Sequence, residues 1–239
     1  MNRVAAILPA AGLGTRMGAE TPKQFLSLDG VPVLLFTLRR LAACPAITDF
    51  VISTRAEEVD SLAALVATEN FGGRRVRVVR GGDTRQDSVA NALTEIPTEA
   101  DLILVHDAVR PLVTLSQIER VIAEAAACDA AILGIPAMDT VKEVKRASLP
   151  NDVALITATI PRERVVLAQT PQVFRASLLL EAFGRARQDG VSASDEAGLI
   201  ERMGRDVHVV VGSERNLKIT RPGDMELAEF YLRQERAGL

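Results

Sequence analysis

The sequence alternates between two hydrophobic patterns along most of its length. Short runs of consecutive apolar residues, such as VAAIL at 4–8 and LILV at 102–105, are typical of strands that are buried on both faces of a sheet. Between these runs, apolar residues recur every three or four positions, as in VLLFTLRRL at 33–41. That spacing gives a helix one apolar face. The pattern therefore predicts a chain that alternates strand and helix.

This alternation covers most of the chain. Thr114 is expected to cap the helix that follows it, with Gln117 as the reciprocal partner in a capping box. Strands are predicted over 4–8, 49–53, 76–79, 102–106, 130–135 and 208–211, and helices over 33–41, 57–67, 88–93, 118–127, 178–187, 195–203 and from 222 onward. The order favours an α/β fold, with a mostly parallel, twisted sheet and helices on both faces.

The alternation breaks between residues 138 and 168. No helical spacing is present there, and 141–144 and 165–167 are predicted to be short, partly exposed strands separated by SLPND at 148–152. A hairpin of this size cannot bury its own apolar face and usually packs against a partner. We therefore expect a single domain over residues 1–239 that carries a projecting β-arm and forms a homo-oligomer through it.

Composition narrows the class of protein. The chain has 239 residues, 48% of them hydrophobic, which suffices for one large α/β domain. A net charge of −3 argues against a protein that coats nucleic acid, although local arginines can still bind a small anion. Cys44 and Cys128 form no CxxC pair, as expected for reduced thiols in a cytoplasmic protein. Because no apolar run is long enough, we expect no signal peptide and no membrane span.

A glycine-rich loop, PAAGLGTRMG at 9–18, follows the first predicted strand. A dinucleotide fingerprint needs G-x-G-x-x-G with an acidic residue about twenty positions on, and a Walker loop needs G-x-x-x-x-G-K-[ST]. The loop has neither spacing. Its small residues still let backbone N–H groups approach a ligand, and Arg16 and Lys23 add two cations, which is the chemistry of a polyphosphate site. The alternative is a glycine turn with two solvated cations.

Seven stretches in order along the chain carry a resemblance to a known family. They are LPAAGLGTRMG…PKQF at the start, GGDTRQDSV at 81–89, VHDAVRP at 105–111, DTVKEV at 139–144, QTPQVF at 169–174, SDEAGLIE at 194–201 and NLKITRPGDMELAEFYL at 216–232. Together they resemble the 2-C-methyl-D-erythritol 4-phosphate cytidylyltransferases of the GT-A-like nucleotidyltransferase superfamily. The resemblance implies a Rossmann-like nucleotidyltransferase fold. It also implies cytidylyl transfer from CTP to 2-C-methyl-D-erythritol 4-phosphate, with release of pyrophosphate, in the non-mevalonate route to isoprenoid precursors.

The resemblance also implies residues that bind the nucleotide. Arg16 and Lys23 match two catalytic cations that stabilise the charged transition state, and Mg²⁺ is expected to bind mainly through the CTP phosphates. The expected nucleotide contacts are Pro9, Ala10, Ala11, Gly12, Gly14, Gly82, Asp83 and Ser88. The alternatives are a simple turn at 81–82 and a helix-capping role for Ser88.

On the side of the polyol phosphate, Arg162 and Lys218 match the family's positioning cations. The resemblance implies a homodimer in which Thr140 and Arg162 reach from the arm into the neighbouring subunit's site. The stretch TIPRER at 159–164 is unusual for the family, so Arg164 is the alternative to Arg162. Ser194 stands where Thr is expected and keeps a hydroxyl for a substrate contact.

Asp107 and Arg110, which follow the predicted strand at 102–106, complete the candidate site. Asp107 is expected to orient hydroxyls of the polyol or the ribose. Arg110 either holds substrate phosphate or forms an ion pair at the entry of a helix. His106 is interpreted as a packed histidine rather than a general base, because an anionic phosphate nucleophile needs no base, and His208 as a structural residue of an apolar strand.

Three alternative functions compete with the one that the resemblance implies. A cytidylyltransferase for ribitol 5-phosphate or another polyol phosphate would use the same loop and cations, and would differ around the polyol. A non-catalytic nucleotide sensor is disfavoured because the chain keeps cations for both the leaving and the attacking phosphate. A dehydrogenase is disfavoured by the loop spacing and the missing acidic residue.

Overall fold

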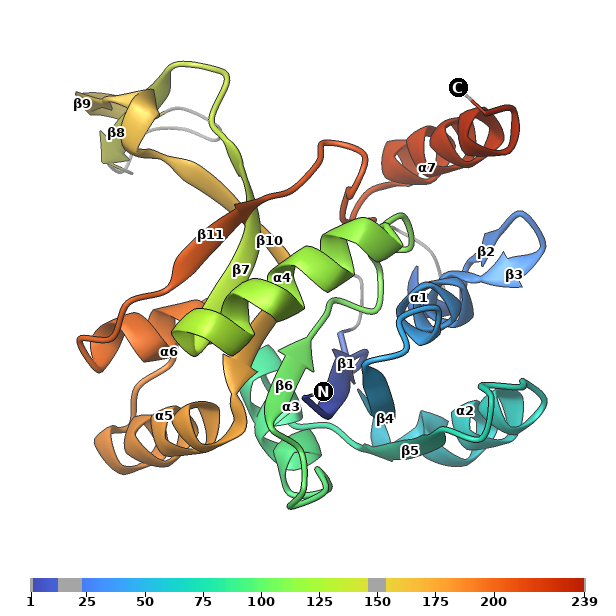
Figure 1. Ribbon diagram of the computed structural model, residues 1–239. Coiled ribbons are helices and arrows are strands. Elements are labelled where there is room, and N and C mark those ends of the chain that lie inside the picture. Colours follow the sequence, from blue (N-terminus) through green and yellow to red (C-terminus); the bar gives the residue numbers. More distant parts are fainter. Residues whose placement is uncertain (1, 13–22, 146–153, 239) are drawn as a thin grey trace.

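The computed structural model describes residues 2–12, 23–145 and 154–238, which fold around one seven-stranded sheet (Figure 1). Its strands are β1 (Val4–Pro9), β4 (Ile47–Thr54), β5 (Arg75–Arg80), β6 (Leu102–Val105), β7 (Ala130–Pro136), β10 (Val166–Arg175) and β11 (His208–Val211). The strand order is β11-β7-β10-β6-β1-β4-β5. Only the two pairs that β10 makes with β6 and β7 are antiparallel within this sheet. The predicted mostly parallel sheet is confirmed.

Helices cover both faces of this sheet (Figure 1). They are α1 (Val33–Ala42), α2 (Val59–Ala67), α3 (Arg85–Leu93), α4 (Leu115–Cys128), α5 (Ala176–Asp189), α6 (Glu196–Arg202) and α7 (Pro222–Arg236), with short 3-10 turns η2 (Lys23–Phe25), η3 (Ala56–Glu58) and η4 (Arg162–Arg164). Side chains alternate along β1, so Leu8 joins α1, α2 and α4 in one core while Ile7 joins α3, α5 and α6 in the other. A strand buried on both faces must be apolar at every position, as predicted from its sequence.

Capping residues explain where two helices begin. Thr114 and Gln117 form the predicted capping box at the start of α4. A second box, made by Thr84 and Asp87, starts α3 at Arg85, three residues before the predicted boundary. Ser88 therefore does not cap a helix.

A hairpin that was not predicted lies between the first loop and α1. A small hairpin of β2 (Ser27–Leu28) and β3 (Val31–Pro32) forms where a loop was expected. Asp29 and Gly30 between them have positive φ angles of 53° and 79°, conformations that Asp and Gly tolerate best. This hairpin packs in a third core with α7, around Leu28, Ile219 and Leu232.

The projecting arm is present but is built differently from the prediction (Figure 1). β8 (Val141–Lys145) pairs with β9 (Leu155–Ile160), a strand that was not predicted. The predicted strand at 165–167 is instead the start of β10, which crosses the main sheet between β7 and β6. The polar stretch QTPQ interrupts the apolar residues of β10. The hydrophobic pattern therefore predicted only the first part of this strand.

No helix within residues 2–12, 23–145 and 154–238 is long and apolar enough to span a membrane.

The packing of Gly134 in β7 generates a stability prediction. A Cβ at Gly134 would lie 2.4 Å from Val166 Cγ1 and 3.0 Å from Val209 Cγ1, so Gly134→Ala should lower the free energy of unfolding by about 1–3 kcal/mol through overpacking. A Cβ at Gly184 in α5 meets nothing within 4 Å. Gly184→Ala should therefore raise the free energy of unfolding by about 0.5–1 kcal/mol. Urea unfolding followed by far-UV circular dichroism compares the two, and shifts of the same sign would contradict this packing.

Candidate functional site

A cleft of about 280 Å³ opens beyond the carboxyl ends of β1, β5 and β6. In the sheet, β4 and β5 lie on one side of β1, and β6, which comes later in the sequence, lies on the other side. Loops that diverge in this way leave a crevice at the switch point of a parallel sheet. The cleft is lined by Pro9, Ala10, Ala11, Gly12, Gln24, Gly82, Asp83, Thr84, Arg85, Ser88, Asp107, Ala108, Val109 and Lys218.

This cleft brings together predicted site residues from distant parts of the sequence. The predicted nucleotide contacts that line it are Pro9, Ala10, Ala11, Gly12, Gly82, Asp83 and Ser88. Asp107 and Lys218, predicted for the polyol, line it too. Gly14, Arg16 and the side chain of Lys23 lie outside the described part of the structure. The backbone of Lys23 begins η2, next to Gln24, which lines the cleft.

Two glycines allow close packing around the loop after β5: Gly81 against the loop after β1, and Gly82 against the start of α3. A Cβ on Gly81 would lie 2.8 Å from Ala11 Cβ and 2.9 Å from Ser88 Oγ. One on Gly82 would lie 2.3 Å from Asp87 Cβ. Ser88 Oγ accepts a hydrogen bond from the Gly82 N–H at 3.1 Å, which fixes the second loop against α3. These glycines are therefore required by close packing and not only by a turn.

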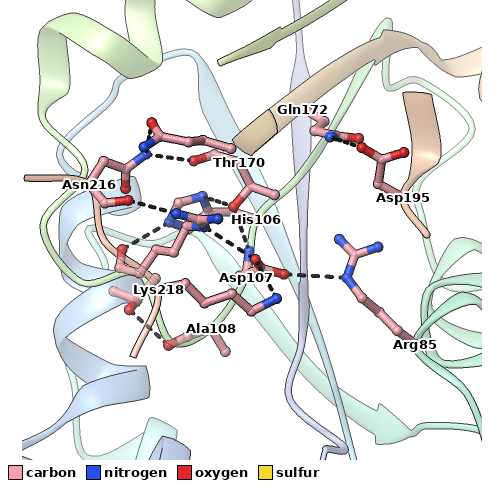
Figure 2. A network of polar contacts seen from close by, with 12 residues as sticks. Arg85, His106, Asp107, Ala108, Thr170, Gln172, Asp195, Asn216 and Lys218 are labelled. Atoms are coloured by element: carbon pink, nitrogen blue, oxygen red, sulfur yellow. Dashed lines mark hydrogen bonds and ion pairs between the residues drawn. The ribbon is translucent and has the colours of Figure 1, made fainter. Parts of the chain in front are cut away.

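The carboxylate of Asp107 lies buried at the floor of the cleft and is surrounded by three cations (Figure 2). Its oxygens lie 3.3 Å from Arg85 Nε, 3.2 Å from Arg110 Nε and 3.0 Å from Lys218 Nζ. Burial alone would raise the pKa of Asp107, but the positive charges of Lys218, Arg85 and Arg110 outweigh it and hold that pKa well below its usual range. The group stays an anion and acts as an acceptor.

Arg85 and Glu196 are site residues that the sequence analysis missed. Arg85 donates to both carboxylate oxygens of Glu196, at 2.7 and 3.0 Å, and Glu196 is 1% exposed. Burial opposes the charge of Arg85, but the carboxylates of Glu196 and Asp107 outweigh burial and raise the pKa of Arg85. Both residues lie inside stretches that carried the family resemblance, GGDTRQDSV at 81–89 and SDEAGLIE at 194–201, and this was the available signal.

Arg110 forms an ion pair with Asp107, which was one of its two predicted roles. Its Nε lies 3.2 Å from Asp107 and its Nη1 donates to the Asn216 carbonyl at 2.7 Å. The side chain is 11% exposed and is not among the residues that line the cleft. Asn216 in turn donates to the Thr170 carbonyl at 2.9 Å. Arg110 therefore fastens the segment that carries Lys218 to the loop after β6.

His106 is packed beneath the cleft, as interpreted from the sequence, and is 0% exposed. Its Nε2 lies 3.1 Å from the Arg110 carbonyl, which can only accept, so Nε2 carries the proton. Its Nδ1 then accepts from the Thr170 hydroxyl at 3.0 Å. Burial lowers the pKa of His106 to about 4, so the ring is neutral and fully engaged.

His208 begins the apolar strand β11, as interpreted from the sequence, and its contact with Glu124 of α4 is a structural one. Its side chain is 51% exposed and its Nδ1 lies 2.6 Å from Glu124 Oε1. β11 is the edge strand of the sheet, so this residue is not enclosed in an apolar layer.

Thr140, Arg162 and Ser194 do not line the cleft of their own chain. Thr140 is exposed just before β8, and Ser194 is exposed just before α6. The Arg162 side chain is 56% exposed in η4 of the arm, and its Nη1 donates to the Met138 carbonyl at 2.7 Å. Arg164, its alternative, is also exposed in η4. In the described part of the chain, these residues are therefore separate from the cluster around Asp107.

Comparisons with known proteins give one consistent result. The sequence model of the family described as 2-C-methyl-D-erythritol 4-phosphate cytidylyltransferase matches residues 4–234. The chain is similar to proteins of that name from Solibacter usitatus (50% identical, 98% of each chain covered) and Acidobacterium capsulatum (53%, 97% of this chain and 98% of the other). Its structure is similar to the crystal structure of 4-diphosphocytidyl-2C-methyl-D-erythritol synthase from Anaerococcus prevotii, with TM-score 0.82, 27% identity, and 97% and 99% of the chains covered. The enzyme from Thermus thermophilus matches with TM-score 0.76 and 33% identity over 97% and 99%.

The buried neutral ring of His106 predicts a pH dependence of stability. Its pKa falls from 6.5 in the unfolded chain to about 4 in the folded one, so between these pH values the unfolded chain binds more protons. The contribution of the neutral ring to the free energy of unfolding is complete above pH 6.5 and is lost as the pH falls toward 4. Between pH 7 and pH 5 the loss should be about 2 kcal/mol. Urea unfolding of wild type and His106→Gln at both pH values isolates it, and equal pH dependence of the two proteins would refute this assignment.

Proposed function

The chain belongs to the 2-C-methyl-D-erythritol 4-phosphate cytidylyltransferase family, and from this premise we propose how its own residues carry out the reaction. The protein is a nucleotidyltransferase of isoprenoid biosynthesis that transfers a cytidylyl group from CTP to 2-C-methyl-D-erythritol 4-phosphate and releases pyrophosphate. The observation that carries the residue assignments is that the loops after β1 and β5 meet Asp107 and Lys218 in one cleft. The ribitol 5-phosphate alternative is not favoured by these relatives.

CTP binds between the loops after β1 and β5 in this proposal. The backbone groups of Ala10 and Ala11 and the hydroxyl of Ser88 read the edge of cytosine, and Asp83 contacts the nucleoside. The close approach of Gly81 to Ala11 narrows this part of the cleft. A narrow pocket disfavours a purine by size, and its hydrogen-bond pattern disfavours uracil. Pro9, Gly12, Gly14 and Gly82 shape the backbone around the phosphates.

The chemical step needs charge stabilisation more than proton transfer. The phosphate of the polyol attacks the α-phosphorus of CTP in line, the bond to the bridging oxygen breaks, and pyrophosphate leaves. The nucleophile is already an anion, so no general base is required, and His106 has no free ring nitrogen to offer one. Arg16 and Lys23 stabilise the negative charge that grows toward the leaving group.

The polyol phosphate is held on the other side of the cleft. Lys218 carries a 36% exposed side chain that lines the cleft beside Asp107, so it can attract the attacking phosphate. The Asp107 carboxylate accepts a hydrogen bond from a polyol or ribose hydroxyl. Arg85 holds one oxygen of this carboxylate in position and is itself held by the buried Glu196. Arg110 pairs with the other carboxylate oxygen.

The donor groups of the cleft fit a divalent ion that arrives with the nucleotide. Asp107 is already paired with three cations, and Asp83 is the other carboxylate among the lining residues. One available carboxylate suits Mg²⁺, which usually keeps several waters and binds through substrate phosphates. When bound, Mg²⁺ neutralises phosphate charge and assists pyrophosphate departure. The triphosphate and water would hold it, while Asp83 contacts the nucleoside.

The arm completes the site across a homodimer in this proposal. Met138, Leu155 and Ile156 of the arm are 67%, 59% and 58% exposed, which is unusual for large apolar side chains that have no partner. A second copy would cover them and would bring Arg162 and Thr140 to the neighbouring cleft, where Ser194 also contacts the substrate. Each chain is then one domain over residues 1–239 with a dimerisation arm at about 138–168.

We also propose a cytoplasmic location. Cys44 and Cys128 are both free cysteines, which fits a reducing compartment.

Substrate choice can be tested directly with purified protein. CTP with 2-C-methyl-D-erythritol 4-phosphate should release pyrophosphate at least about 100-fold faster than UTP or ATP with the same acceptor, because a site built for one hydrogen-bond pattern rejects others. Ribitol 5-phosphate should be the poorer acceptor with CTP. EDTA should abolish turnover and excess Mg²⁺ should restore it. Faster release with ribitol 5-phosphate would overturn the acceptor assignment, and full activity after metal removal would overturn the metal assignment.

The shared site predicts complementation between two inactive variants. Arg162→Ala and Lys218→Ala should each lower kcat/KM by at least about 100-fold, because each removes a cation that binds charge in the transition state. In a heterodimer, one site then carries both lesions and the other carries neither. Mixed chains that have exchanged should regain about half the activity of a wild-type dimer for each heterodimer, if the sites act independently.

The neighbouring arginine provides the matched control. Arg164→Ala changes the same 3-10 turn η4 and should keep near-normal activity. Chain exchange is verified by native mass spectrometry. A fully exchanged mixture that stays inactive means that each site is built from one chain, whereas an inactive Arg164→Ala with an active Arg162→Ala moves the arm cation by two residues.

A further inference from the structure

Three side chains of the kinds that bind zinc converge on α4 and β11. Glu124 and Cys128 lie one turn apart on α4, and His208 is the first residue of β11. The carboxylate, thiol and imidazole each offer an atom within 4.8 Å of the other two. No other group of three such side chains was found in residues 2–12, 23–145 and 154–238.

This cluster lies at the opposite end of the sheet from the cleft. His208 pairs with Ala131, at the start of the parallel strand β7, whereas the cleft opens beyond the carboxyl ends of the strands. In Figure 1, β11 forms the edge of the sheet beside α4. A ligand at the cluster would therefore not contact the substrates.

The three side chains are held in position by contacts within the fold. His208 Nδ1 lies 2.6 Å from Glu124 Oε1, which joins the edge strand to the helix across 84 residues of sequence. The Cys128 thiol lies 3.1 Å from the Glu124 carbonyl and 3.2 Å from the Ala130 carbonyl. The His208 and Glu124 side chains are 51% and 42% exposed, so an ion from solvent can reach them.

We propose that Glu124, Cys128 and His208 form a binding site for a thiophilic divalent cation of the Zn²⁺ class. A thiolate, an imidazole and a carboxylate are the ligands that Zn²⁺ takes in proteins, with a water in the fourth position. Mg²⁺ and Ca²⁺ prefer oxygen ligands alone and are not expected to bind here. Tetrahedral donors stand about 3.5 Å apart. His208 Nδ1 and Glu124 Oε1, which are 2.6 Å apart, therefore have to separate by about 1 Å if both bind the ion.

Binding exchanges protein hydrogen bonds for bonds to the metal. The Cys128 thiol loses its proton to solvent and the sulfur binds the ion as a thiolate. The hydrogen bond between His208 and Glu124 is replaced by one coordination bond from each residue to the ion. The ion would then clamp the edge strand β11 onto α4. Since β11 is otherwise held in the sheet by β7 alone, the site serves stability rather than turnover.

Cobalt and zinc titrations of the full-length chain test this site. The reduced protein, treated with a chelator and free of nucleotide, is titrated with Co²⁺, and Zn²⁺ is then used as competitor. We expect one ion per chain, a near-ultraviolet thiolate-to-cobalt absorption, and an increase in Tm of roughly 5 °C when Zn²⁺ exceeds its Kd about 100-fold.

Four proteins distinguish this site from unspecific binding. Cys128→Ser keeps a hydroxyl for the two carbonyl contacts but should lose the thiolate absorption, and His208→Gln should weaken Zn²⁺ binding at least about 10-fold. Cys44→Ala removes the other, buried thiol and should bind as wild type does. The proposal fails if wild type gives no thiolate absorption, if Cys128→Ser keeps it, or if Cys44→Ala loses it. Far-UV circular dichroism of each variant verifies folding, and His208→Gln decides the matter should Cys128→Ser not fold.

Discussion

The buried carboxylate of Asp107 is the constraint on which the candidate site depends. A charge removed from water must be paired, or its desolvation costs several kcal/mol. Here the pairing is made by Arg85, Arg110 and Lys218, which come from α3, the loop after β6 and the segment after β11. One carboxylate therefore fixes three separate segments at the mouth of the sheet. The same pairing keeps Asp107 ionised and Lys218 beside the cleft.

The polar side chains of β10 extend this network beneath the cleft. The Thr170 hydroxyl accepts the Asp107 N–H at 3.0 Å and contacts His106 (Figure 2). Gln172 donates to Asp195 at 2.8 Å and accepts the N–H of Ala197, on either side of Glu196. Buried polar groups need partners, and β10 supplies them where an apolar strand could not. This explains why a central strand of the sheet carries the polar stretch QTPQ.

The two ends of the sheet have different structural demands. At the carboxyl ends, Gly81 lets two loops approach closely and forms a narrow cleft rich in backbone groups. At the opposite end, Glu124 and His208 tie a helix to an edge strand that has one strand neighbour. The arm extends from β7 and β10 (Figure 1), and its exposed apolar side chains are separate from both. The cleft, the edge strand β11 and the arm are thus three separate parts of each folded chain.

The sequence by itself determined the strand and helix alternation, the two-sided burial of β1 and the capping box at Thr114, whereas the cleft-lining stretch at 81–88 was identified through the family resemblance. The first three features are local, because burial periodicity and capping act between residues a few positions apart. Only the tertiary structure decided that β10 enters the sheet antiparallel and that β9 pairs with β8. It also decided that Arg85 meets Glu196 and that Arg110 is used in an ion pair. Such pairs join residues distant in sequence, and the strand order that brings them together leaves no periodic signal in the chain.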